Sequence, residues 1–96
     1  MKRLSDADIA SALQELPAWT VHEAKLHRKY VFPDFAHAMG FLALATPKIE
    51  KMDHHPEWSG VYNRINVDLT THSAGGITQR DVDLAKLLES IAAKLL

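Results

Sequence analysis

The sequence predicts one α+β domain over residues 1–96, with elements in the order αββαββα. Apolar residues recur at helical spacing in three segments, and they alternate with polar residues in four shorter segments. Proline, glycine and asparagine separate these segments. One apolar stripe per helix and one apolar face per strand predict a four-stranded antiparallel sheet with three helices packed on one face. The other face is left for solvent or for another subunit.

The first helix and the first two strands are predicted from local signals near the N-terminus. Ser5 and Asp8 form the pattern of a helix N-cap with an acid three residues later, and Pro17 ends the helical spacing that follows. Alternation then predicts a short strand at residues 19–21 and a longer one at residues 26–32.

The second helix is predicted over residues 34–52, where apolar residues return to helical spacing. The expected apolar stripe consists of Phe35, Met39, Leu42, Ile49 and Met52. Pro47 lies inside this stretch and lacks a backbone N–H donor, so it is expected to kink or interrupt the last turns.

The last elements form a second hairpin and a final helix. A period of two over residues 64–71 predicts a strand, and a shorter strand at residues 57–61 precedes it across a turn at 62–63. Thr78 and Asp81 then have the spacing of a capping box at the start of the last helix.

Composition excludes several classes of function. Eleven basic and twelve acidic residues give a net charge of −1, which provides no electrostatic reason to bind nucleic acid or an anionic membrane. The absence of cysteine excludes disulfides, a thiol nucleophile and cysteine-based metal sites. No signal-like or membrane-spanning segment is evident, so a cytoplasmic location is expected. Six histidines are the unusual feature, and they favour acid–base or metal chemistry.

Three of these histidines are predicted to meet at the open end of the second hairpin. A tight turn at residues 62–63 makes facing residue numbers sum to about 125, so that residue 54 faces 71 and residue 53 faces 72. His54, His55 and His72 are then expected roughly 5–8 Å apart at their Cβ atoms. A one-residue change in register would alter only which imidazole points in which direction.

Proton transfer suits this predicted cluster better than metal binding does. A neutral imidazole accepts a proton while a second one donates, and Glu50, Asp53 and Glu57 lie nearby in the sequence. Adjacent histidines seldom ligate one ion, and no zinc-binding motif is present, so no metal is expected. The alternative reading is that these histidines are polar loop residues with structural hydrogen bonds.

Other candidate residues each have a structural interpretation. Trp19 and Trp58 could stack on a flat ligand, although buried packing is the usual role of such rings. Asp81 is explained as a helix cap, whereas Arg80 in the first turn is unfavourable and predicts a local partner or a ligand. The remaining histidines, expected to be solvated or structural, are His22, His27 and His37.

The spacing of these motifs closely resembles the pterin-4a-carbinolamine dehydratase family. The residues that carry the resemblance are Glu50, His54, His55, Pro56, Trp58, Tyr62, Asn63, His72, Gly76, Thr78 and Asp81. The motif covers roughly the second half of the chain, and the predicted αββαββα order fits the family along the rest.

The resemblance implies a dehydratase that converts 4a-hydroxytetrahydropterin to quinonoid dihydropterin and water. Such an enzyme recycles the pterin of aromatic amino acid hydroxylases, and the pterin is its substrate, so no cofactor is expected. His54 and His72 would be the acid–base pair, and His55 would bind or orient the pterin. The implied supporting or substrate-binding residues are Glu50, Asp53, Pro56, Trp58, Arg80, Asp81 and Trp19.

The resemblance also implies protein association. Animal relatives serve as dimerisation cofactors of a homeodomain transcription factor, so a non-catalytic interaction module on the same fold is the alternative function. A homodimer or homotetramer is expected, and the small core of a 96-residue chain would benefit from association.

Overall fold

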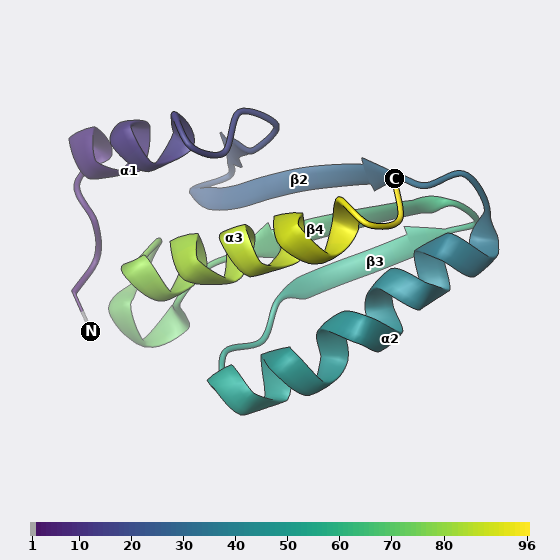
Figure 1. Ribbon diagram of the computed structural model, residues 1–96. Helices are drawn as coiled ribbons and strands as arrows, with labels where there is room; N and C mark the ends of the chain where they lie inside the picture. Colours follow the sequence, from purple (N-terminus) through teal and green to yellow (C-terminus); the bar gives the residue numbers. More distant parts are fainter. Residues whose placement is uncertain (1) are drawn as a thin grey trace.

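Two central strands provide the apolar face on which the rest of the chain packs. The structure, a computed structural model, describes residues 2–96 (Figure 1). Strands β2 (Lys25–Val31) and β4 (Arg64–Leu69) pair in the middle of the sheet, with β1 (Thr20–His22) outside β2 and β3 (Glu57–Val61) outside β4. All three pairings are antiparallel, in the order β1-β2-β4-β3.

The register of the central strands places their apolar residues on one side of the sheet. Tyr30 faces Ile65 and Leu26 faces Leu69, and these side chains are buried together with Val67. The alternate residues of each strand point to the open face, as the predicted period of two requires. Polar and charged residues dominate that face, among them His27, Lys29, Glu57, Arg64, Asn66 and Asp68.

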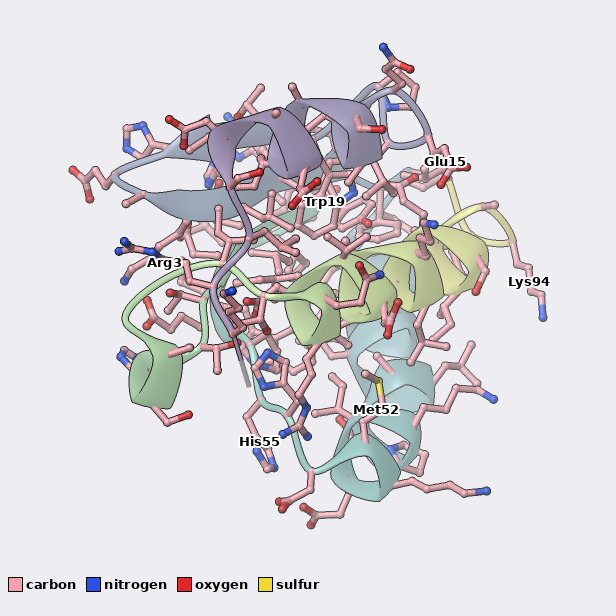
Figure 2. All side chains as sticks on the ribbon, turned by 90° about the vertical axis from the view of Figure 1, so that its left-hand side faces the viewer. Arg3, Glu15, Trp19, Met52, His55 and Lys94 are labelled. Atoms are coloured by element: carbon pink, nitrogen blue, oxygen red, sulfur yellow. The ribbon has the colours of Figure 1, made fainter. Side chains whose placement is uncertain are left out.

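Three helices cover the apolar side of the sheet, as predicted. Figures 1 and 2 show α1 (Asp6–Leu13) nearest the β1 edge, α2 (Phe35–Met52) nearest the β3 edge, and α3 (Gln79–Ala92) between them. A short 3-10 helix, η1 (His72–Ala74), connects β4 to α3. The predicted caps are present: Ser5 accepts a hydrogen bond from the backbone of Asp8, and a capping box opens α3.

The predicted stripe of the second helix is confirmed in part: Ile49 is buried and Met39, Leu42 and Met52 are half-buried against the core. Its buried residues are Ala38, Phe41, Ala45 and Ile49, whereas Phe35 at its start is 52% exposed. The Phe41 ring packs within 4.9 Å of the Tyr30 ring and 5.2 Å of the Phe32 ring, measured between centroids. The small alanines on either side of Phe41 let the helix lie close to the sheet, so aromatic packing decides the rotation of α2.

The predicted interruption at Pro47 is wrong. Helix α2 runs on through Met52. Proline removes the hydrogen bond to the carbonyl four residues earlier, here that of Ala43, and both residues are exposed. Water can therefore satisfy the carbonyl that loses its partner, and the helix continues.

A polar cluster joins β2 and the residue before β1 to helix α3. One carboxylate oxygen of Glu89 accepts hydrogen bonds from Trp19 Nε1, Arg28 Nε and the Tyr30 hydroxyl at 2.8–2.9 Å. Burial opposes ionisation of this carboxyl, but the three donors outweigh it and hold the pKa of Glu89 below its usual value. Burial also raises the pKa of Tyr30, so its hydroxyl stays a donor.

No helix within residues 2–96 combines the length and the apolar character needed to cross a membrane.

Candidate active site

The second hairpin has the predicted register over its paired length. Glu57 faces Asp68 and Val61 faces Arg64, so facing numbers sum to 125 as expected. The direct pairing predicted beyond this point, of residue 54 with 71 and of 53 with 72, does not form. Thr71 forms an isolated bridge with Gly76 instead, because the chain turns into η1 after β4.

The open end of this hairpin is where the three motif histidines are located. His54 and His55 precede β3, and His72 follows β4. Since β3 and β4 run antiparallel, the start of one and the end of the other lie at the same end of the sheet. Figure 2 shows His55 at this end, close to the end of α2 at Met52.

A fully buried carboxylate connects the segments around His54. Asp81 Oδ2 accepts hydrogen bonds from the backbone N–H of Thr78 and from the Thr71 hydroxyl, both at 2.9 Å. Its other oxygen, Oδ1, lies 2.5 Å from Nε2 of His54. The cap predicted for α3 is therefore also the group that holds a candidate catalytic histidine.

Arg80 provides a second link between α3 and the end of α2. Its guanidinium donates to the carbonyl oxygens of Met52 at 2.6 Å and Asp53 at 2.9 Å. Asp53 ends the helix in the left-handed region, with φ of 53°, which turns the chain so that His54 enters the interior. The local partner predicted for Arg80 is thus the negative end of the α2 dipole.

Each motif histidine has its own carboxylate partner. The Nε2 atoms of His55 and His72 lie 3.2 Å from Glu50 and Glu57 respectively, alongside the His54–Asp81 contact already described. All three contacts are made through Nε2, the ring atom that donates when the imidazole is in the tautomer with its proton on Nε2. Among the described contacts, Nδ1 of these three rings takes part in no hydrogen bond.

The three pairs differ in burial. The side chain of His54 is 10% exposed and its Asp81 partner is fully buried, whereas the side chains of His55 and His72 are 59% and 81% exposed. The first pair is therefore held rigidly by its surroundings, and the other two lie at the surface.

Hollows flank the cluster on two sides. A pocket of about 190 Å³ is lined by His55, Glu50, Pro56 and Trp58 together with Thr46 and Ile49. A separate hollow of about 260 Å³ has His72 in its wall. His55 and His72 thus line separate hollows, and His54 is in the wall of neither. Across residues 2–96, no group of three or more histidines and carboxylates is arranged to hold a metal ion.

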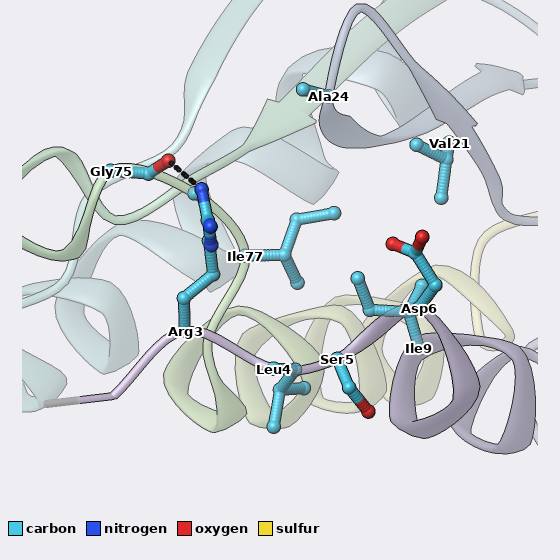
Figure 3. Close-up of a pocket in the computed structure, with 10 residues that line it drawn as sticks. Arg3, Leu4, Ser5, Asp6, Ile9, Val21, Ala24, Gly75 and Ile77 are labelled. Atoms are coloured by element: carbon cyan, nitrogen blue, oxygen red, sulfur yellow. Dashed lines mark hydrogen bonds between the residues drawn. The ribbon is translucent and has the colours of Figure 1, made fainter.

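The N-terminal segment supports the loop that carries His72. The backbone N–H of Leu4 donates to the carbonyl of Ile77 at 2.8 Å, and Arg3 donates to the carbonyl of Gly75 at 3.4 Å, beside a hollow of about 400 Å³ (Figure 3). A Cβ atom on Gly76 would lie 2.5 Å from Cδ of Arg3, so glycine lets this segment lie close to the loop.

Two features of the site depart from the sequence analysis. Trp19 lies away from His55 (Figure 2); its ring packs edge-on against Tyr30 and its N–H donates to Glu89. The role of Thr71 in the site was missed, although the sequence contained a signal for it. Thr71 continues the buried row of Ile65, Val67 and Leu69, and it is the polar residue in that row.

Comparisons with known proteins agree over nearly the whole chain. The family model described as "Pterin 4 alpha carbinolamine dehydratase" matches residues 2–91. A protein of Solibacter usitatus, provisionally named as a pterin-4-alpha-carbinolamine dehydratase, is 56% identical over 91 residues, covering 95% of this chain and 96% of its own. A Rhodopseudomonas palustris protein of the same provisional name is 50% identical, covering 99% and 96%.

A solved structure shares the fold. The crystal structure of a protein from Brucella melitensis, described as a transcriptional coactivator/pterin dehydratase, matches this chain with a TM-score of 0.91 and 40% identity. The match covers 95% of this chain and 99% of that one.

Replacing the buried carboxylate should weaken the fold measurably. In Asp81→Asn, an amide N–H₂ group replaces one of the two acceptor oxygens and faces a donor. We expect the free energy of unfolding to fall by about 1–3 kcal/mol, measured by urea denaturation. Asp83→Asn on the same helix is the control, since Asp83 is exposed and its hydrogen bond is to the exposed side chain of Gln79; its effect should stay within about 0.5 kcal/mol. Equal effects of the two variants would contradict the central role of Asp81.

Proposed function

Because this chain belongs to the pterin-4a-carbinolamine dehydratase family and is a hydro-lyase of that type, we propose that it converts 4a-hydroxytetrahydropterin to quinonoid dihydropterin and water by histidine acid–base catalysis. The product can then be reduced and reused as the pterin of an aromatic amino acid hydroxylase. The observation that carries the proposal is the pairing of three imidazoles with three carboxylates at one end of the sheet.

The reaction requires two proton transfers and no redox change. The C4a–O bond breaks, and the departing hydroxyl leaves as water with a proton from a general acid. A general base removes the proton from N5, and the electron pair of the N–H bond forms the new C4a=N5 double bond. Groups that exchange protons near neutral pH suit both steps, which is the property of imidazole.

His54 and His72 are the proposed acid–base pair. Asp81 holds His54 through Nε2, and Glu57 contacts His72 through the same ring atom. Both rings therefore keep Nδ1 for the substrate. A carboxylate partner also stabilises the imidazolium that forms when a ring accepts a proton, as in other histidine–carboxylate pairs.

His55 is proposed to bind and orient the pterin. It lines the pocket that also contains Glu50, Pro56 and Trp58. The Trp58 ring packs edge-on against Phe41, with centroids 6.4 Å apart, so its position is set by the core. Its half-buried ring forms an apolar wall for a flat heterocycle, and Glu50 orients the imidazole.

The His54→Ala, His72→Ala double variant tests the proposed catalysis. Since one histidine acting as acid or base contributes about 10²–10⁴-fold, losing both should remove nearly all catalysed dehydration. The measurement is stopped-flow dehydration of an enzymatically generated 4a-hydroxypterin, with the spontaneous rate subtracted.

A matched control is available on the open face of the sheet. His22 and His27 are neighbouring histidines, with ring centroids 5.5 Å apart, and both lie outside the proposed site. The His22→Ala, His27→Ala variant should retain the parental rate. Dehydration that stays at the parental rate in the His54→Ala, His72→Ala variant would exclude the mechanism.

We also propose that the chain forms a homodimer or homotetramer. Large apolar side chains remain exposed in the isolated chain, and Val61 and Val31 flank Arg64 in one row across the open face. Burial of such side chains in an interface would be favourable. Light scattering at micromolar concentration should give a dimeric or tetrameric mass; a monomeric mass would contradict the proposal.

A second candidate function is that of a protein-interaction module. It is favoured by the Brucella melitensis relative, which is described as a transcriptional coactivator as well as a pterin dehydratase. On this proposal, affinity capture from cell extract should recover the same protein partner with the parent and with the His54→Ala, His72→Ala variant. Recovery of no protein partner with the parent would count against it.

A further inference from the structure

Glu57 connects three elements at the open end of the second hairpin. As the first residue of β3, it points to the open face of the sheet. Its two carboxylate oxygens have separate partners: Oε1 accepts from Lys25 Nζ at 2.6 Å, and Oε2 accepts from His72 Nε2 at 3.2 Å. The side chain thus joins β2, β3 and η1.

Sheet pairing does not explain a carboxylate at this position. Glu57 lies directly opposite Asp68, and like charges at facing positions destabilise an antiparallel pair. Asp68 already has a partner of its own in His27, at 2.9 Å. The Lys25 ammonium offsets the repulsion between Glu57 and Asp68. A neutral side chain at position 57 would cause no repulsion and would need no lysine beside it.

The carboxylate of Glu57 is well suited to control the His72 ring. The Lys25 ammonium hydrogen-bonded to it holds the pKa of the Glu57 carboxyl below its usual range, and His72 adds a smaller effect in the same direction. Glu57 is therefore ionised at neutral pH and can only accept. The His72 side chain is 81% exposed, and Glu57 is the side chain to which its ring is hydrogen-bonded among the described contacts.

We propose that Glu57 is the positioning residue of His72 and that Lys25 holds Glu57 in place. The Lys25–Glu57–His72 chain keeps the imidazole in one rotamer, with Nε2 donating to the carboxylate and Nδ1 facing the substrate. Glu57 acts only through His72 and does not touch the pterin. The inference rests on the proposed function, in which His72 transfers a proton.

A double-mutant cycle tests this dependence. In Glu57→Gln, the amide oxygen can still accept from Lys25, which leaves the amide N–H₂ facing the Nε2–H of His72. We expect kcat for the catalysed dehydration to fall about tenfold and KM to change less than about twofold, a smaller loss than that of the histidine itself. In the His72→Ala background, the same Glu57→Gln change should cost less than about twofold.

Two further variants test whether kcat depends on the Glu57–His72 hydrogen bond or only on the negative charge in this part of the sheet. Lys25→Met frees the carboxylate without removing it, so kcat should fall by about threefold and only when His72 is present. Asp68→Asn removes the same charge at the facing position, where it contacts His27 instead, and should leave kcat within about twofold of the parent. Urea denaturation checks that every variant is folded under assay conditions.

The outcomes distinguish this inference from the proposed function. A loss with Glu57→Gln that is equally large in the His72→Ala background would overturn the positioning role, as would an equal loss with Asp68→Asn. If His72→Ala lowers kcat strongly while Glu57→Gln does not, the inference fails and the proposed function stands. If His72→Ala leaves kcat unchanged, the role of His72 fails and this inference fails with it.

Discussion

The buried carboxylate of Asp81 is the interaction on which the arrangement of the site depends. It accepts the Thr78 backbone N–H at the start of α3, the Thr71 hydroxyl after β4, and Nε2 of His54 between α2 and β3. Burying a carboxylate costs free energy unless donors satisfy its oxygens, so the fold is favoured when these three segments come together around Asp81. The Asp81 carboxylate therefore contributes both to folding stability and to the position of the proposed catalytic residue His54.

The three histidine–carboxylate pairs show how one end of a sheet can hold groups of similar chemistry in different environments. His54 is held inside by a fully buried partner, whereas His55 and His72 are exposed and have partners on α2 and β3. Burial fixes the orientation of His54, whereas the exposed rings of His55 and His72 depend on their carboxylate partners for theirs. All three positions hold an imidazole, and they differ in how deeply the partner carboxylate is buried.

Local signals predicted the elements well because each depends on residues close together in the chain. The period of two and the short turn set the register of β3 against β4 as far as Glu57 and Asp68. The predicted stripe of α2 was only partly right: Phe35 is exposed and the ring at the centre of the buried face is Phe41, because that ring packs against Tyr30 of β2. The pairing expected beyond Glu57 was also wrong, because Thr71 found its partners in the loop and helix that follow.

The sequence by itself determined the αββαββα order, the two caps and the placement of His54, His55 and His72 at one end of the second hairpin. These follow from hydrophobic period, turn length and the alternation of strand direction. Only the tertiary structure decided which carboxylate pairs with which imidazole, and that Trp19 belongs to the Glu89 cluster. Partners such as His54 and Asp81 are 27 residues apart, and their contact depends on how α3 packs against the sheet. No local pattern contains that information.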